Sequence, residues 1–129
     1  MSADLPIVAI VDDDIAARRA IARLLASQHF HVKQFATAQQ YWTSADANEA
    51  CCVLIDMDLG DGITGLDLAK AIRSSKWPIP IIFMTGSADL ATRARAEAFG
   101  CIAYLEKPCP AEQLLAAVRK ARATAESVI

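Results

Sequence analysis

The stretch PIVAIVDDD, residues 6–14, places six consecutive apolar residues directly before three acids. A strand that is apolar on both faces is typical of a parallel sheet with helices covering each side. Polar residues that follow such a strand lie at its carboxyl end, where open parallel sheets bind their ligands. This stretch therefore predicts a buried strand of an α/β fold with a functional site at its end.

Four further runs of similar length follow along the chain, and three of them are almost entirely apolar. They are His31–Phe35, Cys51–Ile55, Pro80–Met84 and Cys101–Leu105. Segments between the runs repeat apolar residues at helical spacing, as in 17–25, 38–45, 65–72 and 111–118. We therefore expect five strand–helix units, a doubly wound five-stranded parallel sheet, in a single domain over residues 1–129. The helix expected at Asp89–Ala98 has an inward face made mostly of alanine, so little hydrophobic area holds it.

The composition excludes several classes of protein. Hydrophobic residues make up 54% and charged residues 22% of the chain, which is the balance of a globular domain and not of a disordered one. The formal net charge is -2, and no dense field of Lys and Arg is present to bind nucleic acid. No apolar run approaches the ~20 residues that a membrane span needs, and the N-terminus lacks the positive charge of a signal peptide. We therefore expect a cytoplasmic protein that binds neither nucleic acid nor membrane directly.

Reactive side chains follow four of the five expected strands. They are Asp12, Asp13 and Asp14 after the first strand, Asp56 after the third, Thr85 after the fourth and Lys107 after the fifth. Carboxylates gathered at one edge repel one another unless a cation lies among them, and Mg²⁺ prefers such oxygen ligands. Asp56 is then placed as a nucleophile that forms an aspartyl phosphate, while Lys107 and Thr85 offer a charge and a hydroxyl to phosphoryl oxygens. Taken singly, Asp12 and Asp14 would also suit helix N-caps, and Thr85 and Lys107 a turn and a solvated charge.

Four segments together resemble the receiver domain of two-component response regulators. They are Ile10-Val11-Asp12-Asp13-Asp14, Val53-Leu54-Ile55-Asp56, Phe83-Met84-Thr85-Gly86 and Tyr104-Leu105-Glu106-Lys107-Pro108. The resemblance covers nearly the whole chain and implies a flavodoxin-like (βα)5 fold with strand order 2-1-3-4-5. It implies these roles: phosphoacceptor and metal ligand for Asp56, direct metal ligand for Asp13, indirect ligand for Asp12, backbone-carbonyl ligand for Asp58, switch hydroxyl for Thr85, aromatic switch partner for Tyr104 and phosphate sensor for Lys107.

The resemblance also implies partners. A sensor histidine kinase or a small phosphodonor would supply the phosphoryl group, with Mg²⁺ or Mn²⁺ as cofactor. The fourth helix, fifth strand and fifth helix would form the output face, for a downstream effector domain or protein or for a second receiver in a homodimer. Such a switch catalyses only its own phosphorylation and dephosphorylation, so we do not expect an enzyme acting on other substrates. The Lys107-Pro108 peptide bond is expected to be cis.

Three positions depart from the family pattern. Receivers usually place a glycine eight residues after the phosphoacceptor, whereas here Gly65 is ninth, so the loop from Met57 to Thr64 carries one extra residue. Gly60 replaces the proline that is common in that loop, and Cys109 stands where phenylalanine usually follows Lys-Pro. The course of the loop and the packing around Cys109 therefore do not follow from the resemblance.

Three other readings of the same residues stay open at this point. Asp56-Met57-Asp58 resembles the Asp-x-Asp signature of haloacid-dehalogenase-type phosphatases, but the acidic pair that binds metal in that family is lacking after Lys107. Residues 60–65 spell G-x-G-x-x-G, which dinucleotide-binding folds use, although Asp56 and Asp58 would repel a pyrophosphate. A receiver-like scaffold that is not phosphorylated is the third reading, and the retained reactive residues argue against it.

Overall fold

A computed structural model of the protein describes residues 5–44, 49–60, 62–86 and 89–126. The strands are β1 (Ile7–Val11), β2 (His31–Phe35), β3 (Cys52–Asp56), β4 (Ile81–Thr85) and β5 (Ala103–Glu106). The helices are α1 (Ile15–Ser27), α2 (Ala38–Trp42), α3 (Gly65–Arg73), α4 (Leu90–Phe99) and α5 (Ala111–Glu126). All strands are parallel, in the order β2-β1-β3-β4-β5. The expected flavodoxin-like α/β fold is therefore confirmed.

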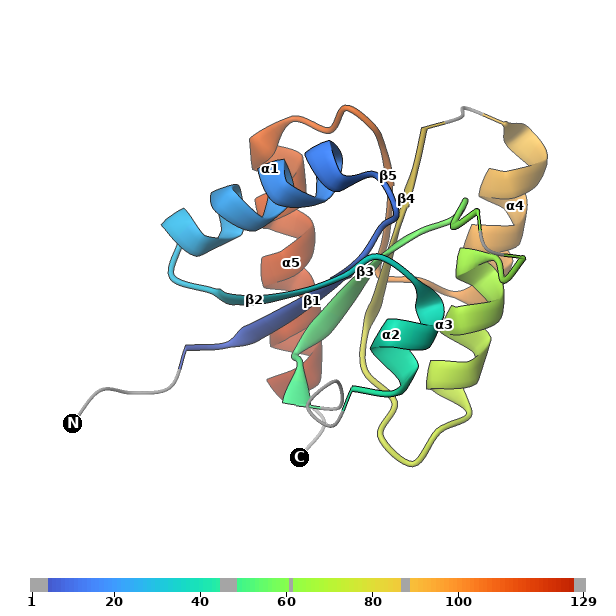
Figure 1. Ribbon diagram of the computed structural model, residues 1–129, viewed down its shortest axis with the longest axis horizontal. Helices are drawn as coiled ribbons and strands as arrows, with labels where there is room; N and C mark the ends of the chain where they lie inside the picture. Colours follow the sequence, from blue (N-terminus) through green and yellow to red (C-terminus); the bar gives the residue numbers. More distant parts are fainter. Residues whose placement is uncertain (1–4, 45–48, 61, 87–88, 127–129) are drawn as a thin grey trace.

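Helices cover both faces of the sheet. α1 and α5 lie on one face, and α2, α3 and α4 lie on the other (Figure 1). In β3, Val53 and Ile55 belong to the apolar cluster beneath α2, α3 and α4. Cys52 and Leu54 alternate with them and belong to the cluster beneath α1 and α5. The central strands are apolar on both faces because each face packs against helices.

The ends of four strands differ by one or two residues from those expected, and β1 begins at Ile7 instead of Pro6. β3 and β4 end with Asp56 and Thr85, so these two polar residues belong to the strands instead of following them. β5 begins at Ala103 and not at Cys101. Gly100 ends α4 with a left-handed φ of 85°, and the chain uses the next residues to turn back toward β4. The carboxyl ends of the strands still form the edge that carries the polar residues.

Helices α1 to α4 begin with polar caps, and the helices differ in how firmly they pack. Asp89 caps the N-terminus of α4, so the helix starts one residue later than expected. Ala96 is the buried residue of α4, and Leu90 is 81% exposed, which fits the weak anchoring predicted from its alanine-rich face. α2 ends at Trp42, and Ala45, which we expected on the same helix, lies outside the described residues. None of the helices in the described ranges is long and apolar enough to cross a membrane.

Candidate functional site

The reactive side chains gather where the carboxyl ends of the central strands meet. Asp12 (0% exposed), Asp56 (5%) and Thr85 (3%) are buried polar residues, whereas Asp13 is exposed. An open pocket lies beside them, and its lining residues are Asp13, Asp14, Ala17, Asp56, Asp58, Gly60, Gly86, Lys107 and Pro108. The structure thus brings together residues that are up to 95 positions apart in the sequence.

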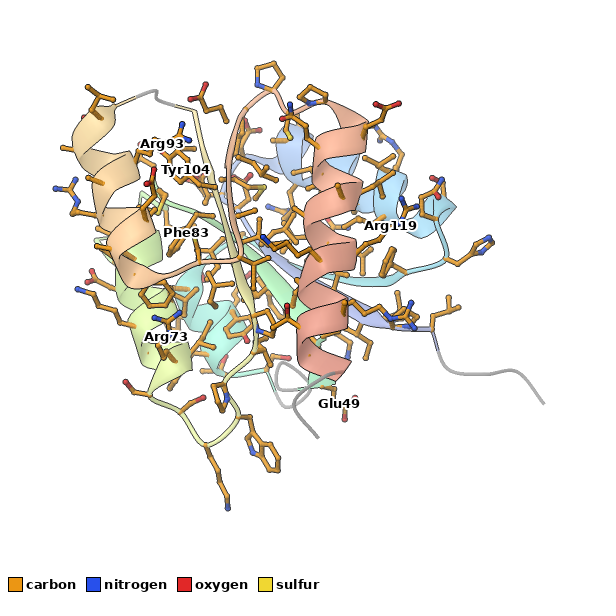
Figure 2. All side chains as sticks on the ribbon, turned by 180° about the vertical axis from the view of Figure 1, so that it is seen from behind. Glu49, Arg73, Phe83, Arg93, Tyr104 and Arg119 are labelled. Carbon is orange, nitrogen blue, oxygen red and sulfur yellow. The ribbon has the colours of Figure 1, made fainter. Side chains whose placement is uncertain are left out.

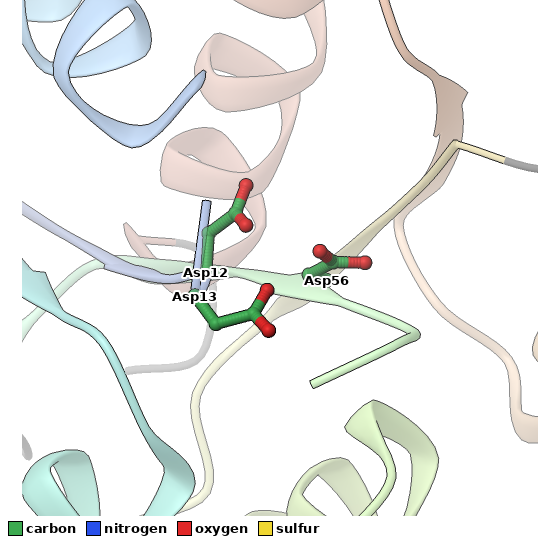
Figure 3. Close-up of side chains that lie close together, drawn as sticks. All are labelled: Asp12, Asp13 and Asp56. Atoms are coloured by element: carbon green, nitrogen blue, oxygen red, sulfur yellow. The ribbon is translucent and has the colours of Figure 1, made fainter. Parts of the chain in front are cut away.

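Three carboxylates form the centre of the site (Figure 3). Asp12, Asp13 and Asp56 each offer an oxygen, and these oxygens all lie within 4.8 Å of one another. Asp12 and Asp13 follow β1 directly, and Asp56 is the last residue of the neighbouring strand β3. Hard divalent cations take carboxylate oxygens as ligands. The donor set therefore suits Mg²⁺ or Mn²⁺.

Lys107 supplies the positive charge of the site. Its ammonium nitrogen lies 2.6 Å from Asp12 Oδ2 and 3.0 Å from Asp56 Oδ2, and its side chain is 20% exposed. The other carboxylate oxygen of Asp12, and that of Asp56, each accepts a hydrogen bond from a backbone amide. Asp14 N donates to Asp12 Oδ1 at 2.9 Å, and Asp58 N donates to Asp56 Oδ1 at 3.0 Å. Both buried carboxylates are therefore hydrogen-bonded through both oxygens.

The titration of Asp56 reflects its position at the edge of the core. Burial raises the pKa of Asp56 from 3.8 to about 6, because a charged carboxylate loses hydration there. The Asp58 amide and the Lys107 ammonium lower this pKa in part, and the neighbouring Asp12 carboxylate raises it. Burial lowers the pKa of Lys107, but hydrogen bonds to Asp12 and Asp56 outweigh that effect and raise its pKa overall. The lysine is thus held as an ammonium ion next to the nucleophile candidate.

The backbone after β5 directs Lys107 toward the acids. The Lys107 amide donates to the Thr85 carbonyl at 2.7 Å, which extends the pairing between β4 and β5 by one residue. The Lys107-Pro108 peptide bond is cis, as the resemblance predicted. Cys109 follows and packs, partly buried, against the apolar cluster beneath α1 and α5.

Asp14 has a different role from the two acids before it. Its carboxylate caps α1 by accepting from Ala16 N at 3.1 Å and Ala17 N at 3.3 Å. The N-cap alternative that we kept for both Asp12 and Asp14 therefore holds for Asp14 alone. Arg18, which the sequence gave no reason to single out, donates to the Asp12 carbonyl at 2.8 Å and fixes the backbone after β1.

The loop between β3 and α3 takes up its extra residue before the helix. Gly65 lies so close to the end of β3 that a Cβ atom there would stand 2.2 Å from the Asp56 carbonyl oxygen. Glycine is therefore needed at this position although it is the ninth residue after Asp56 and not the eighth. The added length lies in the preceding segment, where Gly60 and Gly62 have positive φ angles of 73° and 88°. Asp58 lines the pocket, and its carbonyl as a metal ligand stays a prediction.

The two expected switch residues lie on neighbouring strands. Thr85 ends β4, and Tyr104 in β5 stands opposite Phe83 of β4. The Tyr104 hydroxyl is buried and has no hydrogen-bond partner within the part of the chain that the structure describes. The ring is thus turned inward. Their roles in switching stay predictions.

Arg93 links α4 to the Tyr104 ring, which the sequence did not indicate. The centre of its guanidinium lies 5.6 Å from the centroid of the Tyr104 ring, and its Nε lies 2.8 Å from Glu97 Oε1 one turn further along α4. Figure 2 shows Arg93 and Tyr104 next to each other at one end of α4. A cation over an aromatic face is attracted by the negative face of the ring.

Arg73 of α3 holds the opposite end of α4. Its guanidinium lies 3.5 Å from the centroid of the Phe99 ring and donates to the carbonyls of Phe99 and Gly100. Phe99 in turn meets Phe83 of β4 edge-on, with ring centroids 5.6 Å apart. α4 is therefore held at its two ends by arginine–aromatic contacts, with little apolar burial between them.

Comparison with known proteins identifies relatives of one kind. The family described as the response regulator receiver domain matches residues 8–119. Nodulation protein W of Bradyrhizobium diazoefficiens is 35% identical over 112 residues, which cover 87% of this chain and 49% of that protein. The transcriptional regulatory protein FixJ of the same organism is 32% identical over 117 residues, 91% of this chain and 57% of that protein. The chain spans about half the length of the curated relatives it matches.

Solved structures agree with the sequence comparison. The response regulator receiver domain protein (CheY-like) of Methanospirillum hungatei superimposes with a TM-score of 0.85 at 25% identity, covering 95% of this chain and 98% of that one. The haloacid-dehalogenase alternative gains no support, since the matched family and these relatives are response regulators. The G-x-G-x-x-G segment is also explained without a dinucleotide, because Thr64 and Asp67 already cap the N-terminus of α3 reciprocally.

Proposed function

Because the chain belongs to the response regulator receiver domain family, we propose that Asp56 accepts a phosphoryl group in a reaction that depends on a divalent cation. The observation that carries this proposal is the pairing of Asp56 with Lys107 at 3.0 Å beside two further carboxylates. Such an arrangement presents one buried nucleophilic oxygen to an open pocket. The phosphoryl donor is a sensor histidine kinase or a small phosphodonor.

The cation site is formed by Asp12, Asp13 and Asp56, with the backbone carbonyl of Asp58 as a further ligand. When bound, Mg²⁺ or Mn²⁺ offsets the negative charge that carboxylate and phosphoryl oxygens bring together. Asp12 is buried and bonded to Lys107, so it acts on the cation indirectly, whereas the exposed Asp13 is free to ligate it directly.

Transfer of the phosphoryl group requires little covalent chemistry from the protein. A carboxylate oxygen of Asp56 forms a bond to phosphorus while the bond from phosphorus to the donor's leaving atom breaks. The Lys107 ammonium then binds a phosphoryl oxygen in place of the Asp56 oxygen that it holds now. The buried Thr85 hydroxyl donates to another phosphoryl oxygen, so the position of this side chain at the end of β4 depends on phosphorylation.

The output of the switch belongs to the same proposal. α4, β5 and α5 form the face that a downstream effector domain or protein, or a second receiver, recognises. The relatives are about twice as long as the matched region, so the effector is proposed and not identified. Residues 1–129 form one receiver domain, which acts in the cytoplasm and catalyses no reaction beyond its own phosphorylation and dephosphorylation.

Incubation with acetyl phosphate and Mg²⁺ tests the proposal. Intact mass should rise by one phosphoryl group, the product should be labile to base, and chelation by EDTA should prevent its formation. Asp56→Asn should abolish the modification. Asp14→Asn is the matched control, because asparagine retains the α1 cap at the same edge of the sheet, and its modification should equal that of the wild type. Equal modification of Asp56→Asn would show that another residue is the acceptor.

A further inference from the structure

Gly60 stands beside the carboxylate of Asp13. A Cβ atom built on Gly60 would lie 2.8 Å from Asp13 Oδ2, which is closer than such atoms approach in proteins. The loop backbone after β3 therefore borders directly on the exposed acid of the cluster. This contact joins two segments that are 47 positions apart in the sequence, and glycine is the residue that leaves room for it.

Gly62 has the same left-handed backbone conformation as Gly60 but has no such contact with Asp13. Its φ of 88° is left-handed like the 73° of Gly60, so a side chain at either position meets similar strain. A Cβ on Gly62 would find nothing within 4 Å. The two glycines thus separate the requirement for a left-handed turn from the requirement for space next to Asp13.

The Asp13 side chain can move away from a side chain introduced at position 60. A substitution there should therefore displace this carboxylate and leave the backbone in place. The atom in the way is the end of an exposed side chain and not backbone, so the fold can absorb the change by moving the carboxylate. The Asp13 carboxylate would then be displaced from the position in which one of its oxygens lies within 4.8 Å of oxygens of Asp12 and Asp56. Substitution should therefore alter the cation site more than the fold.

We propose that Gly60 is a positioning residue for the cation site: it leaves the space in which the Asp13 carboxylate faces Asp12 and Asp56. This inference rests on the proposed function, in which those carboxylates bind Mg²⁺. It assigns to the lengthened loop a role in setting cation affinity, in addition to connecting β3 with α3. Mutation of a group that orients a metal ligand typically lowers metal affinity by about 10- to 100-fold.

The experiment compares Gly60→Ala with Gly62→Ala in an NMR titration with MgCl₂ alone. Gly60→Ala should weaken Mg²⁺ binding about tenfold or more, whereas Gly62→Ala should bind like the wild type. The carboxyl-carbon signal of Asp13, recorded without metal, should move in Gly60→Ala and stay in place in Gly62→Ala. Both variants should lose similar thermal stability, because both place alanine at a positive φ.

The outcomes separate this inference from the proposed function. Equal Mg²⁺ affinities for the two variants, or an unmoved Asp13 signal in Gly60→Ala, would overturn the role of Gly60 alone. A wild type that shows no saturable Mg²⁺ binding would contradict the proposed function. The metal-free Asp13 signal would still decide whether Gly60 positions the carboxylate.

Discussion

Asp56 is held where its negative charge is unfavourable until a cation or a phosphoryl group arrives. Burial raises its pKa to about 6, despite the opposing effects of the Asp58 amide and Lys107. In the proposed function this residue must be a reactive carboxylate, and the same environment makes its charge unfavourable in the resting fold. At the scale of one residue, function and stability are therefore in conflict.

Replacement of Asp56 by Asn should stabilise the protein in EDTA at pH 8, by roughly 1–3 kcal/mol for a shift of about two pKa units. The folded-state pKa is raised above its usual 3.8, so this group's contribution to stability is full below about pH 4 and is lost as pH rises through about 6. The gain in Asp56→Asn should thus be present at pH 8 and vanish near pH 4. Urea unfolding at the two pH values measures it.

The result that would contradict this prediction is a variant that is less stable than the wild type at pH 8, or a difference that does not change with pH. The first result would mean that the Lys107 and Asp58 contacts outweigh burial, and the second that they balance it and leave the pKa of Asp56 unshifted. Asp14→Asn is again the comparison, since it tests the general effect of removing an acid from this edge.

At the scale of elements, α4 is the least firmly anchored helix that flanks the site. Ala96 is its buried residue, and arginine–aromatic contacts hold its ends: Arg93 with Tyr104, and Arg73 with Phe99. Elements with few buried apolar contacts open most readily. A turn of the Tyr104 ring would release one end of α4 while Arg73 keeps the other end in place, so we expect the helix to pivot about Phe99.

Arg73→Ala should therefore loosen the C-terminal end of α4, and Arg93→Ala its N-terminal half. Amide hydrogen exchange should accelerate in the corresponding half of the helix, and Arg73→Ala should lower the free energy of unfolding by roughly 1–2 kcal/mol. Arg95→Ala is the control, because Arg95 is an exposed arginine of the same helix and its loss should cost less than about 0.5 kcal/mol. Uniform exchange across α4 in all three variants would rule out separate anchors.

The elements themselves were predictable because local pattern determines them. Strands such as β3 read as apolar on both faces, and α4 could be recognised as weakly held from its alanines. The exact ends of the strands were not predictable, since the start of β5 depends on how the chain turns after Gly100. The link between α4 and Tyr104 was also missed, because a cation above a ring joins residues whose spacing in the sequence carries no signal.

At the scale of the whole molecule, the sequence predicted which residues form the site. It did not predict which of their side chains contact one another. Parallel strands bring their carboxyl ends to one edge, so Asp12, Asp56 and Lys107 had to meet. That Lys107 would bond both acids, or that Gly60 would border Asp13, depends on side-chain positions that only the folded chain defines. The site is joined to α4 by other contacts: Thr85 and Tyr104 lie on the paired strands β4 and β5, and Arg93 of α4 lies over the Tyr104 ring.

The central claim is that this site and the face formed by α4, β5 and α5 act as one switch. The most direct measurement is the change in NMR chemical shifts on adding beryllofluoride and Mg²⁺, which together mimic the phosphoryl group on Asp56. A ligand shifts an equilibrium only through contacts that differ between two states, and we propose that Thr85 and Lys107 make those contacts. We predict changes that begin at Asp13 and Asp56 and extend through Tyr104 into residues 89–122, with none in Asp56→Asn. Changes confined to the loops around Asp13 and Asp56, with residues 89–122 unaffected, would contradict the account.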